Sequence, residues 1–383
     1  MHLQLKNIGQ IKDVDIRFGD LTVFVGPQAT GKTIALEFLK LAVDLDGIQE
    51  TMRRYGLDWS GELRDFFGLY FGEGMQGLWQ DGRSEFRWRG SPVPLNSLLK
   101  RSPRGRLESV FYIPAQRVLA LRDGWPQPFS AYSSGVPFVL REFSENLRQL
   151  MGQFKVGGTL FPEKRWLNKE FRGLLEQNIF AKFKLVLETQ FMQMRLVLKS
   201  GEQSLPFMVW SAGQREFVPL LLGLYWLLPP VPLARRSRIR WVVLEELETG
   251  LHPRAIETVL LIVLELVARG YRVCLSTHTA QVLEALWALR NLRANRASPQ
   301  ALLCVFDAPV TPSLRRLAET VMTKQIRVYC FDSTSGATRD ISALDVDSED
   351  VGEDGWGGLS EFSGRVNATV ARAVANAERQ VRT

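Results

Sequence analysis

The stretch that decides the fold is Gly26-Pro27-Gln28-Ala29-Thr30-Gly31-Lys32-Thr33, which matches the pattern G-x-x-x-x-G-K-[ST] at every defined position. Backbone N–H groups of such a loop surround a β-phosphate, the lysine ammonium neutralises β and γ oxygens, and the hydroxyl ligates Mg²⁺. Residues 21–25 form a β-rich run before it, and residues 34–43 have helical spacing after it. We therefore expect ATP and Mg²⁺ here, bound by Gly26, Gln28, Ala29, Thr30, Gly31, Lys32 and Thr33.

Two adjacent carboxylates follow a second apolar run, residues 239–244. A phosphate-binding loop of this kind works with a distant strand that ends in a carboxylate for magnesium and, in hydrolases, with a neighbouring base for water. Packing alone does not explain Glu245 and Glu246, because burying carboxylates without a cation is costly. We assign Glu245, together with Thr33, to the metal and Glu246 to catalysis as the base. The two glutamates could also exchange these roles, and Glu245, where aspartate is commoner, could reach the metal through a water.

A histidine follows a third apolar run, residues 272–276. The chain has only three histidines, and His278 stands where it could reach a γ-phosphate and sense its presence. Taken alone, a histidine at the end of a strand is more often a cap or a core residue. In this order of motifs we expect His278 to be a catalytic γ-phosphate sensor.

The order of these motifs resembles that of ABC-type P-loop ATPases of the soluble branch that includes chromosome-maintenance, recombination-repair and overcoming-lysogenisation-defect (OLD) proteins. Ser211-Ala212-Gly213-Gln214 resembles the S-G-G-Q signature of that family. Residues 245–253, Glu-Glu-Leu-Glu-Thr-Gly-Leu-His-Pro, are similar to the E-E-P-E-x-x-L-H-P run of OLD-like ATPases, with leucine in place of proline. The resemblance covers most of residues 1–306. It implies an α/β fold, with an ABC-type head that has a mixed central sheet, an antiparallel β-subdomain and an inserted helical lobe.

The resemblance also implies that each ATP site is shared between two subunits. Ser211, Gly213 and Gln214 would bind the γ-phosphate held by the opposite subunit, because a helix N-terminus presents free N–H groups and the positive end of a dipole. The alternative is that Ser211 is only an N-cap. Residues 249–252 would form the loop that crosses the dimer interface.

Gln116 stands at the end of a further expected strand, residues 110–114. In the family that the chain resembles, a glutamine in this place couples magnesium to the helical lobe, so the resemblance implies that Gln116 contacts the nucleotide and the metal. The motif Tyr-Ile-Pro-Ala-Gln-Arg at residues 112–117 could equally form a structural corner, with Arg117 paired to a carboxylate.

Four segments are expected along the chain. Residues 1–120 would form the P-loop and antiparallel β part, residues 121–210 the helical lobe and the strands that lead to the signature, residues 211–335 the second ATPase half, and residues 336–383 an acidic, partly flexible tail. In more detail, the patterns predict an antiparallel pair in 3–18, a strand in 84–88, a helical insert in 137–183, strands in 184–198 and 204–209, helices in 211–228 and 255–268, and strands in 301–306 and 326–331.

Composition narrows the class of protein. With 383 residues and 45% hydrophobic residues, the chain can build a large core. The absence of a bilayer-length apolar run and of a leader pattern predicts a cytoplasmic protein without membrane contact. The net charge of +7 permits nucleic acid as a partner, and basic residues cluster in 100–106 and 235–240.

The three cysteines have no metal-ligand spacing, which indicates that they pack in the core. Residues 345–347 superficially resemble the acidic pair of an OLD nuclease, but no apolar strand leads into them, so we set a nuclease aside.

Three functions fit these expectations. The favoured one is a regulatory or sensor ATPase that acts as a homodimer or larger homo-oligomer with a protein effector, of the kind that the resemblance places in bacterial antiphage defence and toxin–antitoxin-like pairs. The alternative is a DNA repair or maintenance ATPase that clamps DNA in an ATP-dependent dimer. The third is a nucleotide-locked scaffold that binds ATP and barely hydrolyses it.

Overall fold

A six-stranded sheet forms the centre of the computed structural model, in the order β16-β15-β3-β14-β13-β6. The strands are β3 (Leu21–Val25), β6 (Val110–Ile113), β13 (Trp241–Glu245), β14 (Arg272–Ser276), β15 (Ile326–Phe331) and β16 (Thr338–Asp340). All neighbours pair in parallel except β15 and β16. The structure describes residues 1–59, 61–94, 98–99, 109–163, 167–190, 192–228, 238–344, 359, 365–367 and 369–371.

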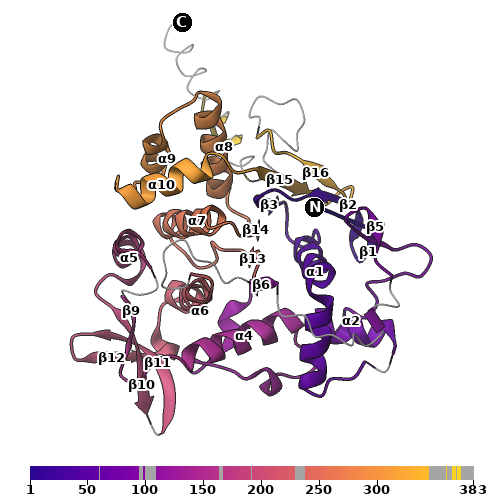
Figure 1. Cartoon of the computed structure of the whole chain (residues 1–383), viewed down its shortest axis with the longest axis horizontal. Helices are drawn as coiled ribbons and strands as arrows, with labels where there is room; N and C mark the ends of the chain where they lie inside the picture. Colours follow the sequence, from indigo (N-terminus) through magenta and orange to yellow (C-terminus); the bar gives the residue numbers. More distant parts are fainter. Residues whose placement is uncertain are drawn as a thin grey trace, which may run out of the picture.

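Side chains of the central strands alternate between two hydrophobic cores, as expected for a sheet that is covered on both faces. Val242 and Leu244 of β13 belong to one core, and Trp241 and Val243 belong to the other. Helix α1 (Lys32–Arg54) covers one face, while α6 (Ala212–Leu227) and α7 (Pro253–Ala268) cover the opposite face (Figure 1). The continuous apolar runs of the sequence are therefore the strands that are buried from both sides.

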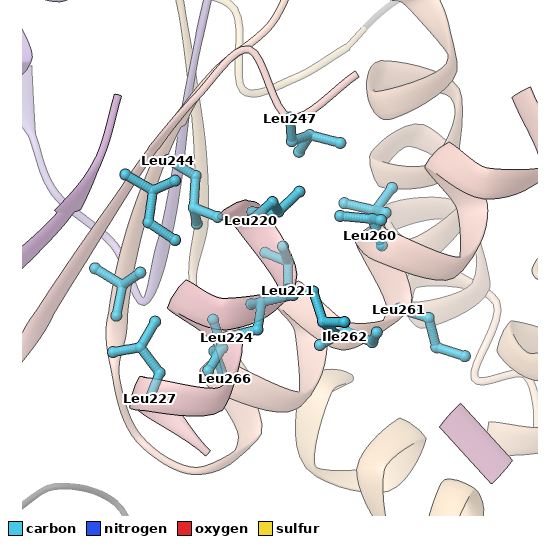
Figure 2. Packing of buried hydrophobic residues seen from close by; sticks show 14 of the residues in the cluster. Leu220, Leu221, Leu224, Leu227, Leu244, Leu247, Leu260, Leu261, Ile262 and Leu266 are labelled. Carbon is cyan, nitrogen blue, oxygen red and sulfur yellow. The ribbon is translucent and has the colours of Figure 1, made fainter. Parts of the chain in front are cut away.

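Leucines of α6 and α7 interdigitate behind β13 (Figure 2). Leu221 and Leu224 of α6 and Leu261 of α7 are fully buried or nearly so. Replacing one such leucine by alanine removes about 2 to 5 kcal/mol of stability, depending on how far the surroundings collapse. This core fixes the starts of both helices relative to the end of β13.

Two antiparallel sheets flank the centre. One has the order β2-β1-β4-β5, formed by β1 (His2–Ile8), β2 (Ile11–Arg17), β4 (Glu85–Trp88) and β5 (Ser91–Pro92). The other has the order β12-β11-β10-β9, formed by β9 (Thr159–Phe161), β10 (Lys184–Gln190), β11 (Gln193–Ser200) and β12 (Gln203–Pro206). The antiparallel pair expected in residues 3–18 and the strand expected in 84–88 are confirmed.

The remaining elements connect these sheets. The helices are α2 (Leu63–Phe71), α4 (Phe138–Met151), α5 (Lys169–Leu175), α8 (Ala280–Ala294), α9 (Pro299–Val305) and α10 (Pro312–Val321). A short 3₁₀ turn, η1 (Arg117–Ala120), and the pair β7 (Leu121–Arg122) and β8 (Trp125–Pro126) lead from β6 toward α4. Within the described ranges, each helix is too short or too polar to cross a membrane.

Four local predictions were wrong in whole or in part. Residues 301–306 lie in α9 and its C-cap, not in a strand, because Ser298 and Pro299 start a helix and the buried Leu302, Leu303 and Phe306 follow at helical spacing. The insert 137–183 is not helical throughout, since it contains β9, which pairs with β10 beyond its end. Residues 184–198 are two strands, β10 and most of β11, and residues 207–209 form a 3₁₀ turn after β12.

Candidate nucleotide site at the carboxyl edge of the sheet

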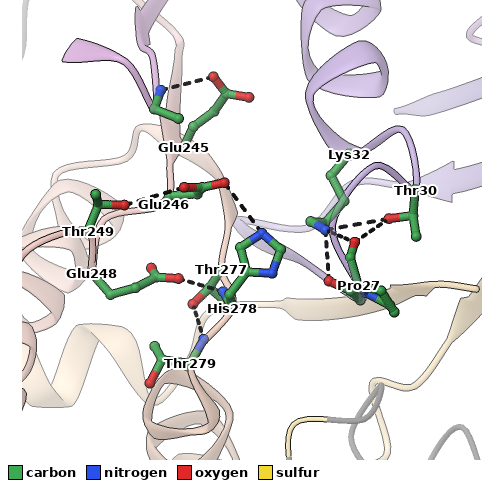
Figure 3. A network of polar contacts seen from close by, with 12 residues as sticks. Pro27, Thr30, Lys32, Glu245, Glu246, Glu248, Thr249, Thr277, His278 and Thr279 are labelled. Atoms are coloured by element: carbon green, nitrogen blue, oxygen red, sulfur yellow. Dashed lines mark hydrogen bonds and ion pairs between the residues drawn. The ribbon is translucent and has the colours of Figure 1, made fainter. Parts of the chain in front are cut away.

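The register of the central sheet brings three of the predicted motifs to one edge. Glu245 pairs with Ser276, and Ser276 pairs with Phe24, so the residues that follow β13, β14 and β3 emerge side by side. These residues are the two carboxylates, His278 and the glycine loop (Figure 3). In open parallel sheets, ligands bind at this carboxyl edge.

Two glycines of the loop occupy places that no larger residue could take. Gly26 has a φ of 129°, and a Cβ there would lie 2.3 Å from the Phe331 carbonyl oxygen of β15. Gly31 has a φ of 96°, and a Cβ there would lie 2.6 Å from Ile11 in β2. Gly31 also caps the N-terminus of α1. The loop is thus held between the central sheet and an antiparallel sheet.

Lys32 folds back into the loop. Its Nζ donates to the carbonyl oxygens of Gly26 at 2.8 Å and Pro27 at 2.6 Å, and to Thr30 Oγ1 at 3.4 Å. Burial lowers the pKa of Lys32 to about 8, while the nearby carboxylates, Glu246 foremost, oppose that shift. A buried ammonium in a loop with a free helix N-terminus is a site that favours an anion.

Glu245 is buried at the end of β13, and its two carboxylate oxygens differ. Oε2 accepts a hydrogen bond from the backbone N–H of Ala115 at 3.1 Å, whereas Oε1 has no partner among the described residues. Burial raises the pKa of Glu245, and the hydroxyl of Thr33 is the first of the groups that lower it. A free carboxylate oxygen beside the hydroxyl of Thr33 fits Mg²⁺, which takes oxygen ligands from one or two side chains and from phosphates.

Glu246 and His278 face each other across the edge. Nε2 of His278 lies 3.4 Å from Oε1 of Glu246, and Thr249 Oγ1 donates to Oε2 of the same carboxylate at 3.4 Å. Glu246 has a φ of 44°, and its backbone N–H donates to the carbonyl oxygen of Ser276 at 3.0 Å. Both side chains are partly open to solvent, at 37% for Glu246 and 26% for His278. A carboxylate that is held but open to solvent can accept a proton from water.

Gln116 is exposed and directly follows Ala115, the residue that binds Glu245. It therefore lies next to the metal candidate. The structural corner is present as well, because Arg117 is fully buried and donates to the carbonyl oxygens of both Glu245 and Glu246. Its nearest ion-pair partner is Glu216, at 3.9 Å.

Ser211 and Gln214 form a capping box at the start of α6. The Ser211 hydroxyl accepts from the Gln214 N–H at 3.3 Å, and the Gln214 side chain accepts from the Ser211 N–H at 3.0 Å. A Cβ on Gly213 would lie 2.7 Å from the Gly250 carbonyl oxygen. In the described part of one chain, no hydrogen bond or ion pair joins Ser211 to Lys32, Glu246 or His278.

Sequence reasoning missed two carboxylates at this site. Glu248 accepts a hydrogen bond from the backbone N–H of His278, and burial raises its pKa. Glu37 is buried in α1, and burial raises its pKa well above the usual range, with the charge of Glu245 adding to the shift. A glutamate inside the otherwise apolar run 34–39 was the available signal for Glu37. Glu248 stands at a defined position of the run 245–253 that carries the resemblance, but no role was assigned to it.

Fold and site together define the class: the chain is a P-loop ATPase. Two family models match it, one described as "AAA domain, putative AbiEii toxin, Type IV TA system" over residues 126–284 and one described as "AAA domain" over residues 2–53. The chain thus carries AAA-type P-loop ATPase domains, the class that binds nucleotide and hydrolyses ATP. No curated protein matches the sequence.

Three solved structures are similar in outline. An SmcHead bound to the C-winged helix domain of ScpA is 11% identical with a TM-score of 0.41, and covers 88% of this chain and 95% of its own. The SMC head domain from Thermotoga maritima is 13% identical with a TM-score of 0.33, covering 88% and 97%. The dimeric bacterial ABC transporter cassette MJ0796 is 13% identical with a TM-score of 0.33, covering 74% and 90%.

Proposed function

We propose that this ATPase hydrolyses Mg²⁺-ATP at sites shared between two copies of the chain, and that turnover regulates a protein effector in a bacterial antiphage defence or toxin–antitoxin-like complex. The observation that carries the hydrolytic part is the meeting of Lys32, the pair Glu245 and Glu246, and His278 at one edge of the sheet. These residues come from three separate strand ends, and packing does not require any of them to be charged there.

Each residue has a role in this proposal. The loop N–H groups and Lys32 hold the phosphates, and Glu245 and Thr33 hold the metal, with Gln116 beside them. Mg²⁺, when bound, neutralises charge that builds on the phosphate oxygens. Glu246 accepts a proton from the attacking water, and His278, 3.4 Å from it, contacts the γ-phosphate.

The shared site rests on the position of the signature. Ser211 is exposed at the N-terminus of a 16-residue helix, and its hydroxyl and backbone N–H bond to its capping partner Gln214. A helix start of this kind offers N–H groups to an anion from outside. Gly213 packs against the carbonyl oxygen of Gly250, so the signature and the loop 249–252 form one surface. A second copy that places its γ-phosphate on Ser211 and Gly213 would complete the site.

The toxin–antitoxin setting of the proposal is supported by the family description over residues 126–284, which names a putative toxin of a type IV toxin–antitoxin system. In this proposal, residues 1–120 and 211–335 supply the ATPase machinery and residues 121–210 supply the lobe that transmits its state. The fourth segment, 336–383, begins with β16 of the central sheet. Residues 345–347 and the basic cluster 100–106 lie outside the described residues, as does half of the cluster 235–240.

A pull-down with Glu246→Gln tests the regulatory function. This variant holds ATP, so a protein effector should co-purify with it from the native host and be absent or reduced with Lys32→Ala, which cannot grip the phosphates. The alternative DNA clamp, motivated by the net charge of +7, predicts that duplex DNA stimulates ATP turnover with a steep loss at higher salt, because phosphate contacts release counterions. If DNA stimulates ATP turnover in a salt-sensitive way and no protein partner co-purifies, the DNA clamp would replace the regulatory function as the better hypothesis.

A further inference from the structure

Arg117 is a fully buried cation that binds backbone carbonyl groups of the candidate site. Its Nη1 donates to the carbonyl oxygens of Glu245 at 3.0 Å and Glu246 at 3.1 Å, and its Nε donates to the carbonyl oxygen of Glu216 at 3.1 Å. Glu216 lies in the first turns of α6, five residues after Ser211. One guanidinium therefore holds both the peptide that carries the catalytic glutamate and the helix that presents the signature.

The contacts of this guanidinium are incomplete in the state described. Its Nη2 has no hydrogen-bond partner among the described residues, and neither has Oε2 of Glu216 or Oε2 of Glu248. All three atoms are buried. Burial lowers the pKa of Arg117, and the two carboxylates that most oppose that shift are Glu216 and then Glu248. The cation thus stands between two carboxylates, each with an unused oxygen.

Glu248 connects this cation to the histidine. Its Oε1 accepts a hydrogen bond from the backbone N–H of His278, the residue whose side chain faces Glu246. A path of polar interactions therefore links His278 to Glu216: a hydrogen bond joins Glu248 to His278, the charge of Glu248 acts on Arg117, and Arg117 donates to the Glu216 carbonyl oxygen. It passes through backbone and side-chain groups that a buried setting makes costly to leave unpaired.

We propose that Arg117 is the positioning residue that links the two ATP sites of a dimer through one subunit: a γ-phosphate at His278 moves Glu248, Arg117 changes its carboxylate partner, and α6 with Ser211 and Gly213 shifts toward the γ-phosphate of the opposite site. This inference rests on the shared site proposed above. In this proposal the path switches between two arrangements, with the free Nη2 paired to Glu248 in one and to Glu216 in the other, because coupling between distant sites requires a bistable element.

The coupling is measurable as ATP-dependent dimerisation. In a Glu246→Gln background, which retains ATP, the dimer dissociation constant is determined by sedimentation with and without Mg²⁺-ATP for Arg117→Lys, Glu216→Gln and Glu248→Gln. Each change should reduce the ATP-induced tightening of the dimer by about tenfold, the usual size of an allosteric coupling. The ATP dissociation constant of the dilute monomer should stay within about twofold, because none of the three substituted residues holds the nucleotide. Glu265→Gln, which breaks the ion pair of 2.8 Å with Arg269 in α7, is the matched control and should change neither quantity.

A merely structural role predicts a different pattern. The double variant Glu216→Gln/Glu248→Gln should lose no more tightening than either single variant if both act through Arg117, whereas independent roles would add. Additive losses, or full ATP-induced tightening in Glu216→Gln and Glu248→Gln, would overturn the inference. Melting temperatures identify any variant that fails to fold. If Arg117→Lys fails to fold, the inference is judged on the two glutamine variants, which keep the shape of the side chain. If the Glu246→Gln parent itself shows no ATP-dependent dimer, the proposal of a shared site is wrong, and so is the proposed coupling through Arg117.

Discussion

Nε2 of His278 lies 3.4 Å from Oε1 of Glu246, although the two residues follow different strands and stand 32 positions apart in the sequence. The backbone fixes both ends of this contact. The Glu246 N–H binds the carbonyl oxygen of Ser276, and the His278 N–H binds Glu248. The pair is therefore held before any substrate arrives, which is the preorganisation that general base catalysis and γ-phosphate contact require.

Replacing Glu246 by glutamine should stop hydrolysis and spare binding. The amide keeps the shape of the side chain but cannot accept a proton from water, so kcat should fall by about 10² to 10⁴. The ATP dissociation constant should change little, since Lys32 and the loop remain. Single-turnover hydrolysis and equilibrium binding of a fluorescent ATP analogue measure the two quantities.

Glu245→Gln is the matched variant, and it settles which glutamate is the base. If Glu245 holds Mg²⁺, its variant should need far more Mg²⁺ for half-maximal turnover, whereas Glu246→Gln should not. A Mg²⁺ requirement that shifts with Glu246→Gln and stays constant with Glu245→Gln would show that the two roles are exchanged. Unchanged turnover in Glu246→Gln would remove it from catalysis altogether.

Lys32 should take up a proton when ATP binds in mildly alkaline solution. Burial places its pKa at about 8 in the free protein, and a triphosphate beside the ammonium raises that pKa. Below pH 8 the lysine is already protonated, so affinity should be flat there, and above pH 8 affinity should fall until the pKa of the bound state is reached. Calorimetry at pH 8.5 in two buffers of different ionisation enthalpy reports the uptake. Identical apparent enthalpies after correction for dilution would contradict it.

Much of the fold could be predicted from the sequence because its central strands are continuous apolar runs. Such runs are typical of a sheet that is covered on both faces. The same pattern gave a wrong prediction for residues 301–306, because a short apolar run fits a strand and a helix equally. These residues are helical because Ser298 and Pro299 start a helix just before them. Within β3, β13 and β14, the register that unites the motifs follows from parallel pairing.

The sequence indicated the residues at strand ends but not the groups behind them. Arg117 was considered only as one partner of an unspecified carboxylate, and its three carbonyl contacts come from residues about 100 and 130 positions away. Such contacts depend on how α6 and β13 pack, which local pattern does not encode. Glu248 was missed for the same reason, since its partner is the backbone of another loop.

Gly26→Ala should destabilise the protein by more than the backbone conformation alone explains. The added Cβ would meet the carbonyl oxygen of Phe331 at 2.3 Å, so β3 and β15 would have to separate. Gly82, with a φ of 72° and nothing within 4 Å of its Cβ position, is the control for conformation. We expect a loss of about 2 to 4 kcal/mol for Gly26→Ala and about 1 kcal/mol for Gly82→Ala, measured by urea unfolding. Equal losses would show that the contact with β15 is unimportant.

Mixing two inactive variants should restore activity if the site is shared. Lys32→Ala destroys the phosphate grip of its own subunit but leaves its signature intact, and Ser211→Arg does the reverse by blocking the exposed helix start that the neighbouring phosphate would occupy. A mixed dimer then contains one intact site, made from the Lys32 of one chain and the Ser211 of the other. Random pairing makes half of the dimers mixed, so turnover should recover to about a quarter of the wild-type value, as two-fold symmetric interfaces require.

The mixing experiment distinguishes the two hypotheses for Ser211, a phosphate-binding residue of a shared site or only an N-cap. If the serine were only the cap of α6, Ser211→Ala would cost about 1 kcal/mol of stability, and Ser211→Arg would act within its own chain. Mixed preparations would then show the sum of the two separate activities and nothing more. Recovery above that sum requires a phosphate held by one copy to meet the signature of another, because neither variant chain contains both halves. ATPase assays at increasing ratios of the two variants, at constant total protein, should therefore pass through a maximum at equal amounts.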